Sequence, residues 1–294
     1  MQLRTAVLTG GGIVAAAAVL GMVVAGAVPG SRQHSSGSDA AIGEARAQSL
    51  TVELPAPASD KIFAGAGAGG RPIVVIDAGH GGHDPGAVSV SGEVSEKELT
   101  LALARELRDL LVKRGRVRVA MTRDGDTYLP LEDRAAVARR LSASLFLSLH
   151  MDSAPNPLAR GASVYSLSDV ASDVDAERFA RVENASSATG QANPGTVQAM
   201  LADLVSRDQM NASADLAARL VRKAAGRVEL RPEPHRFAAF HVLRRSDTPA
   251  VLFEAGYLSN ADDELLLRSP NHRAAIVLAL AQAIEADVAT RRLR

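Results

Sequence analysis

The sequence predicts an α/β fold, a single domain in which helices flank both faces of a twisted, mostly parallel central sheet. Short apolar segments alternate with longer segments whose leucines and alanines follow helical spacing. This alternation is typical of parallel sheets covered by helices on both faces. The first apolar segment also runs into glycine-rich sequence, as expected for a buried strand that ends in a tight turn.

The individual elements follow in chain order. Ser95 is the expected N-cap of the first long helix, because Glu98 three residues later completes a capping box, and Gly115 is its expected end. A long helical segment later in the chain has a possible break near Asn211. The predicted strands are residues 72–77, 117–122, 144–149, 163–166, 242–244 and 249–254, and the predicted helices are 96–113, 131–142, 197–225, 262–267 and 272–288.

The N-terminal residues predict export from the cytoplasm. Arg4 precedes an uncharged apolar run, and residues 25–27 read Ala-Gly-Ala, so residues 1–27 resemble a Sec-type signal peptide that leads to the periplasm. The alternative is an uncleaved membrane anchor, because the run is nearly long enough to span a bilayer. Residues 28–70 are rich in Ala, Gly, Ser and Pro and predict a disordered linker. The folded domain is expected at residues 71–290.

Composition narrows the chemistry. The 294 residues contain no cysteine, which excludes disulfides, thiolate metal sites and a cysteine nucleophile. Any transition metal must therefore be held by His, Asp or Glu. The 33 Lys and Arg residues balance 33 Asp and Glu residues, so the net charge is zero. This balance argues against a dedicated nucleic-acid binder, which normally carries a basic surplus.

Polar clusters follow three of the predicted strands, and they contain His80, His150 and Glu254. In α/β sheets, functional groups gather at the carboxyl ends of the strands. Glu96, at the start of the first long helix, is close to the first cluster. Two His and one Glu with an open fourth position form the ligand set of catalytic zinc sites, and a further carboxylate can act as general base. Taken singly, a strand-end His is more often a structural residue.

Several motifs occur in order over residues 72–288. They are Ile76-Asp77-Ala78-Gly79-His80-Gly81-Gly82, Asp84-Pro85-Gly86-Ala87, Glu96-Lys97, Thr122-Arg123, Leu131-Glu132-Asp133-Arg134, Ser148-Leu149-His150-Met151-Asp152 and Pro249-Ala250-Val251-Leu252-Phe253-Glu254-Ala255-Gly256-Tyr257-Leu258-Ser259-Asn260. With them the chain resembles the zinc-dependent N-acetylmuramoyl-L-alanine amidases of bacterial cell separation. The resemblance implies His80, Glu96 and His150 as zinc ligands and Glu254 as the catalytic carboxylate. It also implies hydrolysis of the bond between N-acetylmuramic acid and L-Ala in peptidoglycan.

Residues 169–199 resemble the regulatory insertion of the same amidases. There, a helix can lie over the active site and place a carboxylate in the open position of the zinc. The resemblance implies Glu183 as this autoinhibitory carboxylate, with Glu177 as the alternative, and a LytM-domain activator protein as a partner. A surface helix with solvated charges is the other interpretation of the segment. We expect the protein to be a monomer.

The sequence also allows alternative roles for several further residues and alternative functions for the protein. Asp77 and Asp152 either orient the ligand histidines or cap turns. Arg123 and Arg134 either bind carboxylates of the stem peptide or hold the fold together, and the structural role is favoured. His83 is left out of the ligand set. The alternative functions are a zinc carboxypeptidase or deacylase acting on peptidoglycan, and a catalytically silent wall-binding module.

Overall fold

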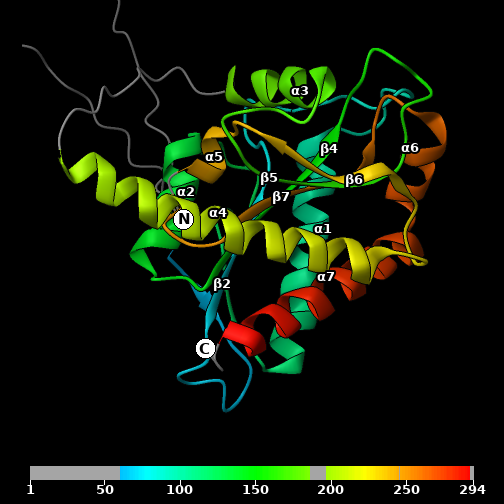
Figure 1. Ribbon diagram of the computed structural model, residues 1–294. Helices are drawn as coiled ribbons and strands as arrows, with labels where there is room; N and C mark the ends of the chain where they lie inside the picture. Colours follow the sequence, from blue (N-terminus) through cyan, green and yellow to red (C-terminus); the bar gives the residue numbers. More distant parts are fainter. Residues whose placement is uncertain (1–59, 186–196, 245, 292–294) are drawn as a thin grey trace, which may run out of the picture. The chain divides into compact units, whose positions relative to one another are not determined.

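The computed structural model of the protein describes residues 60–185, 197–244 and 246–291 (Figure 1). The predicted signal peptide and most of the predicted linker lie outside these residues. Among the residues that are described, no helix combines the length and the apolar character needed to cross a bilayer.

A sheet of seven strands forms the centre of the domain, in the order β1-β3-β2-β4-β7-β5-β6. Strands β3, β2, β4 and β7 run parallel to one another, whereas β1 and β5 run antiparallel to their neighbours β3 and β7. The predicted α/β fold with a mostly parallel sheet is confirmed. The strands are β1 (Ile62–Phe63), β2 (Ile73–Ala78), β3 (Arg118–Met121), β4 (Leu145–Asp152), β5 (Ala162–Leu167), β6 (Leu230–Ala238) and β7 (Ala250–Tyr257).

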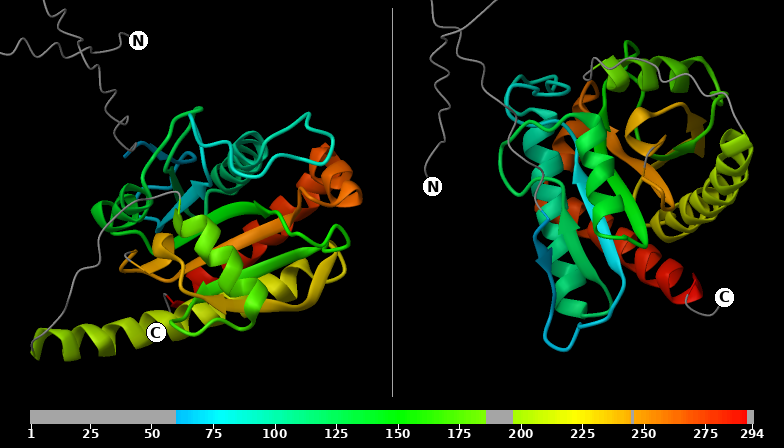
Figure 2. Two further views of the ribbon diagram at one scale, coloured as in Figure 1. Left: turned by 90° about the horizontal axis from the view of Figure 1, so that it is seen from above. Right: turned by 90° about the vertical axis from the view of Figure 1, so that its left-hand side faces the viewer.

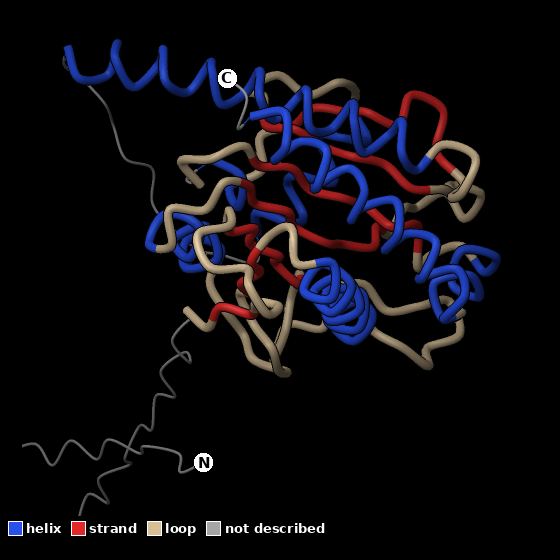
Figure 3. The backbone as a smooth tube through the Cα atoms, turned by 90° about the horizontal axis from the view of Figure 1, so that it is seen from below, coloured by secondary structure: helices blue, strands red, loops and turns tan. Residues whose placement is uncertain are grey.

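Helices cover both faces of this sheet (Figures 2 and 3). The larger apolar core lies between one face and helices α1, α4 and α7, and the smaller core lies between the other face and α2, α3 and α5. The bounds are α1 (Glu96–Arg114), α2 (Leu131–Arg140), α3 (Val174–Ala185), α4 (Val197–Ala224), α5 (His241–Arg244), α6 (Ala261–Arg268) and α7 (Pro270–Arg291).

The side chains of β2 explain why its sequence is a continuous apolar run. Val74 and Ile76 belong to the larger core, whereas Ile73 and Val75 belong to the smaller one. Side chains of a strand alternate between faces, so a strand that is covered on both faces needs apolar residues at every position. Only after Ile76 does the strand turn polar, at the edge where the three polar clusters lie.

Helix α1 is defined by local signals and by its leucines. The Glu98 carboxylate accepts a hydrogen bond from the backbone N–H of Ser95 at 2.9 Å, as the capping box predicts. Gly115 ends the helix with a left-handed φ of 66°. Leu103 and Leu107 are completely buried in the larger core. Burial of each such side chain stabilises the folded state by roughly 1.5–3 kcal/mol. This packing fixes the first turn of α1, where Glu96 lies.

Two elements of the fold differ from the sequence prediction. Residues 242–244, predicted as a strand, lie in helix α5; a short apolar run is compatible with either structure, and here Val242 and Leu243 are buried against the sheet. Strand β6 was not predicted, because Pro232 and Pro234 interrupt its pattern; proline is tolerated here since β6 is an edge strand.

Regular structure also continues past a predicted domain boundary and a predicted helix break. Residues 60–70, assigned to the linker, include β1, which pairs with β3, so the fold begins before residue 71. Helix α4 continues through Asn211 without a break.

Candidate metal centre

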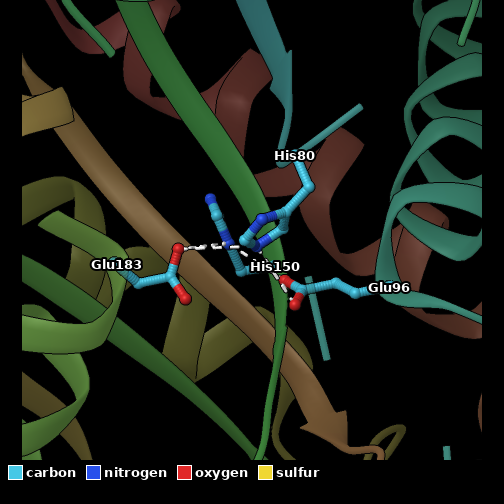
Figure 4. A group of neighbouring side chains, drawn as sticks. All are labelled: His80, Glu96, His150 and Glu183. Carbon is cyan, nitrogen blue, oxygen red and sulfur yellow. Dashed lines mark hydrogen bonds and ion pairs between the residues drawn. The ribbon is translucent and has the colours of Figure 1, made fainter. Parts of the chain in front are cut away.

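The topology brings the three predicted polar clusters together. His80 follows β2, His150 lies in β4 and Glu254 lies in β7, and these three strands are neighbours and parallel. Glu96 opens α1, and Glu183 projects from α3. Figure 4 shows His80, Glu96, His150 and Glu183 converging from four elements that are far apart in sequence.

One potential ligand atom from each of the residues in Figure 4 lies within 4.8 Å of the others, and all four residues are buried. Nε2 of His80 is 3.1 Å from a Glu96 oxygen and 3.5 Å from a Glu183 oxygen. Nδ1 of His150 is 3.0 Å from the other Glu96 oxygen and 3.2 Å from the same Glu183 oxygen. Two nitrogens and two carboxylates facing a common centre form a candidate metal site.

Local backbone geometry presents His80 to this centre. His80 has a left-handed φ of 59°, which is uncommon for a residue with a side chain. A Cβ on Gly79 would come within 2.5 Å of the His150 ring, and a Cβ on Gly86 would come within 2.5 Å of a Glu96 oxygen. Glycine is therefore required at both positions for the loop to approach the two other candidate ligands.

Asp84 orients the His80 ring, and the sequence analysis did not assign it this role. Its carboxylate lies 2.9 Å from Nδ1 of His80, so that Nε2 faces the centre. A carboxylate on the second ring nitrogen is the usual outer partner of a metal-bound histidine. The position of Asp84 in the same loop as His80 is the sequence signal that was available.

Glu96 is held by hydrogen bonds from two backbone N–H groups. Its two oxygens accept hydrogen bonds from Ala87 at 2.9 Å and from Met151 at 3.0 Å. Burial alone would raise the pKa of Glu96, but His80 and His150 lower it below its usual range. Glu96 is thus a preoriented, ionised carboxylate.

The charges of the cluster favour a cation at its centre. Burial alone would lower the pKa of His80, but the carboxylates of Glu96, Asp84 and Glu183 raise it to about 11. A proton on His80 therefore supplies positive charge among these acids. A divalent ion would supply this charge more directly, and it would leave the imidazole neutral as a ligand.

Glu254 lies beside the cluster and is not one of the four converging residues. It is opposite His150 in the pairing of β4 with β7, it is fully buried, and among the described residues neither of its oxygens has a hydrogen-bond partner. Burial, together with the negative charges of Asp152 and Glu96, raises its pKa well above the usual value. Glu254 is therefore suited to take up a proton.

A cavity of ≈ 330 Å³ gives access to the cluster. Its lining includes His80, Glu96, Asp152, Arg178 and Glu183. Burial raises the pKa of Asp152 to about 7, although hydrogen bonds from the Tyr257 hydroxyl and the Ser153 N–H oppose this shift. The arrangement can bind a cation, present a carbonyl to it and exchange a proton.

Asp77 does not orient a ligand histidine, which was one of the two roles predicted for it. Its carboxylate accepts hydrogen bonds from Thr122 at 2.7 Å, Ser148 at 2.7 Å and Arg134 at 3.0 Å. Asp77 has this role because it lies within β2, where its side chain faces the neighbouring strands and α2 rather than the cluster.

Arg123 and Arg134 hold the loop that contains Gly79 and His80 in place, which agrees with the structural role favoured for them. Arg134 donates to the His80 carbonyl at 2.8 Å, and Arg123 donates to the Gly79 carbonyl at 2.8 Å. His83, which was left out of the predicted ligand set, lies against Tyr128 with 4.1 Å between the ring centroids.

Helix α3 carries Glu183 to the cluster, whereas Glu177 is exposed and pairs with Arg181 on the same helix at 2.9 Å. The buried face of α3 is anchored by Phe179, which packs against Tyr165 and Phe240 with centroids 5.5 and 5.4 Å away. The predicted insertion thus contains a helix that packs on the sheet and covers the site.

Comparison with known proteins identifies this arrangement. Residues 74–286 match the Amidase_3 family model, N-acetylmuramoyl-L-alanine amidase. The amidase AmiA of Escherichia coli (strain K12) is 36% identical over 221 residues, which are 74% of this chain and 76% of that protein. AmiC of Neisseria meningitidis serogroup B is 35% identical over 227 residues, 76% of this chain and 54% of that protein.

Solved structures agree with the family model. The catalytic domain of CwlV, an N-acetylmuramoyl-L-alanine amidase from Bacillus (Paenibacillus) polymyxa var. colistinus, superimposes with a TM-score of 0.52 at 28% identity, covering 76% of this chain and 98% of that chain. AmiC2 of Nostoc punctiforme gives a TM-score of 0.56 at 25% identity, covering 76% and 99%. With its fold, its buried His and Glu cluster and its sequence in agreement, the chain belongs to the N-acetylmuramoyl-L-alanine amidase family.

Proposed function

We propose that this peptidoglycan amidase cuts the bond between N-acetylmuramic acid and L-Ala with a zinc ion held by His80, Glu96 and His150, and with Glu254 as general base. The observation that carries the proposal is the convergence of His and Glu donors within 4.8 Å at the carboxyl edge of the sheet. Membership of the amidase family supplies the substrate, which is peptidoglycan.

The donors suit zinc. Histidine nitrogens and carboxylate oxygens are its common ligands, and three protein ligands with one open position are typical of catalytic zinc sites. Nε2 of His80 is buried and has no well-formed hydrogen bond, although a Glu96 oxygen lies 3.1 Å away. This geometry favours two donors directed at a shared ion over a hydrogen bond between them.

The mechanism assigns the proton transfers to Glu254. Zinc, when bound, would supply a Lewis acid that polarises the lactyl carbonyl and lowers the pKa of water. Glu254 accepts a proton as water adds to that carbonyl, and it delivers the proton to the L-Ala nitrogen as the C–N bond breaks. The hydroxyl remains on the carbonyl carbon of the lactyl group, and L-Ala leaves as a neutral amine that carries the transferred proton. The buried position of Glu254 excludes competing water from its carboxylate.

The proposed function is tested with purified sacculi and the full chain, first freed of metal by chelation and then supplied with zinc. We expect no turnover without metal and restored turnover with zinc, releasing intact stem peptides that begin at L-Ala and leaving unbroken glycan. Mass spectrometry of the products distinguishes this result from shortened peptides, deacylated sugars or binding without turnover. Any of these three alternatives, or full activity without metal, contradicts the proposal.

We further propose that α3 autoinhibits the enzyme through Glu183. Its carboxylate oxygen lies 3.2 Å from His150 and 3.5 Å from His80, in the place that a fourth ligand would take. A closed set of four protein ligands is typical of structural zinc sites, whereas catalysis needs an open position. Displacement of α3, for which we propose a LytM-domain activator protein, would open that position.

Replacing Glu183 with Ala is expected to raise basal activity about tenfold or more. Without the Glu183 carboxylate, the state in which α3 covers the site is less favoured, and a larger fraction of the protein is active. Dye release from labelled peptidoglycan measures this rate without an activator. The matched control is Glu177→Ala, which removes an exposed carboxylate from the same helix. Deletion of residues 169–199 should also raise the rate. Unchanged or lower activity in a well-folded Glu183→Ala protein would count against autoinhibition.

The remaining proposals concern location and assembly. The signal-like residues 1–27 and the wall substrate both support export to the periplasm, where the enzyme would act in daughter-cell separation and wall turnover. We propose a monomer with no nucleic-acid partner, in keeping with the zero net charge.

A further inference from the structure

A second cavity adjoins the one that opens on the metal cluster. It has a volume of ≈ 420 Å³ and is formed mainly by the segment after β4, the start of β6 and helix α3. Arg178 of α3 lines both cavities, and Ser153 of the first is followed in the chain by Ala154 of the second. The two cavities therefore adjoin each other beside the His and Glu cluster.

Three arginines line the second cavity, and they differ in how well their charges are compensated. Arg160 pairs with Glu229 at 2.5 Å and with Asp262 at 2.9 Å, so two carboxylates neutralise it. Arg178 forms no ion pair with any described residue; it donates to the Ser153 carbonyl at 3.3 Å, and its buried Nε has no hydrogen-bond partner. Arg178 thus lies at the boundary between the cavities without a close ion pair among the described residues, but it interacts electrostatically with Asp152 and belongs to α3, so it leaves when α3 leaves.

Arg231 is the other under-compensated cation, and it is held rigidly. Its Nη1 donates to the Tyr257 hydroxyl, and its guanidinium lies 5.2 Å from the centroid of the Tyr257 ring. Its one carboxylate partner among the described residues is Asp175 of α3, and that contact is long, at 3.8 Å. The side chain of Arg231 is only 18% exposed, whereas that of Asp175 is 62% exposed. An oriented guanidinium of this kind suits a carboxylate ligand.

The positions of negative charge on the substrate decide which part of it can bind to Arg231. The lactyl carboxyl of the glycan is consumed in the scissile amide, so the negative charges lie on the stem peptide. The second residue of that peptide carries a free carboxylate when it is not amidated. Consecutive Cα atoms are about 3.8 Å apart, so this carboxylate follows the scissile amide by one residue, and the cavity that adjoins the cluster is the one we assign to it.

We propose that Arg231 forms a subsite for the free carboxylate of the second stem-peptide residue, and that Asp175 occupies this subsite while α3 covers the site. The inference rests on the proposed amidase function and deepens it. Helix α3 then places two carboxylates where substrate groups must bind: Glu183 at the metal cluster and Asp175 at the peptide subsite. Arg231, on β6, stays in place when α3 leaves.

The test uses two muramyl tripeptides that differ only at the second residue, which carries either a free carboxylate or a carboxamide. KM and kcat are measured with both for the full chain, for Arg231→Gln and for the conservative Arg231→Lys. A hydrogen bond to a charged group supports a KM about tenfold lower for the carboxylate substrate. Arg231→Gln should abolish this ratio, and Arg231→Lys should retain part of it. A purely structural defect would change KM for both substrates alike.

Asp175→Asn tests the competition. It should lower KM severalfold for the carboxylate substrate only, whereas Glu177→Gln on the same helix, which lines neither cavity, should leave the ratio unchanged. A KM ratio near one in the full chain, or a ratio that survives in Arg231→Gln, overturns the subsite. Calorimetric titration with the two free tripeptides makes the same comparison without turnover. Absent catalysis with preserved discrimination would therefore contradict the proposed function and leave the subsite supported.

Discussion

Replacement of Glu254 with Gln should reduce kcat by about 10²- to 10⁴-fold, which is the usual contribution of a positioned general base. The amide has nearly the same size as the carboxylate but cannot take up a proton, so the loss should appear in kcat rather than in binding. Glu254 is fully buried in β7 and its pKa is raised well above the usual value by burial and by Asp152 and Glu96. The measurement is dye release from labelled peptidoglycan at saturating zinc.

Metal content distinguishes this loss from damage to the site. Because Glu254 is not among the four converging donors, Glu254→Gln should retain one zinc per chain by mass spectrometry. The matched control is Glu106→Gln, which removes one carboxylate from an ordinary ion pair with Arg273 and should keep full activity. Full activity in Glu254→Gln would overturn the assignment of the general base.

Replacement of His80 or His150 with Ala should remove the metal and, with it, essentially all turnover. Each ring faces both carboxylates of the cluster at 3.0–3.5 Å, so either deletion leaves at most two of the three proposed ligands. The loss should exceed the roughly 10- to 100-fold fall in metal affinity or activity that follows loss of an outer partner. Asp84→Asn, which weakens only the support of His80, should fall in that smaller range.

Zinc titration followed by mass spectrometry of the native protein gives the order of affinities. We expect the unaltered chain to bind most tightly, then Asp84→Asn, with the two His→Ala proteins binding weakest. His83→Ala is the control, since His83 is in the same loop but stacks on Tyr128 outside the cluster. Retention of zinc and turnover by His80→Ala or His150→Ala would remove that residue from the ligand set.

Local patterns were sufficient for most of the secondary structure. The capping box of Ser95 and Glu98 and the left-handed Gly115 delimit α1 through interactions only a few residues long. The continuous apolar run of β2 already indicated a strand covered on both faces. Strand β6 and helix α5 escaped the same reasoning, because prolines mask an edge strand and a run as short as Val242-Leu243 fits either structure.

By itself, the sequence determined the fold class and the placing of His80, His150 and Glu254 at or near the carboxyl ends of strands, since hydrophobic periodicity and turn residues act locally. The substrate came from resemblance to a family, because no local pattern encodes it. Only the tertiary structure decided that Asp84 rather than Asp77 supports His80, and that Glu183 rather than Glu177 faces the cluster. These contacts depend on strand order and on how α3 packs on the sheet. They join residues that spacing along the chain cannot relate.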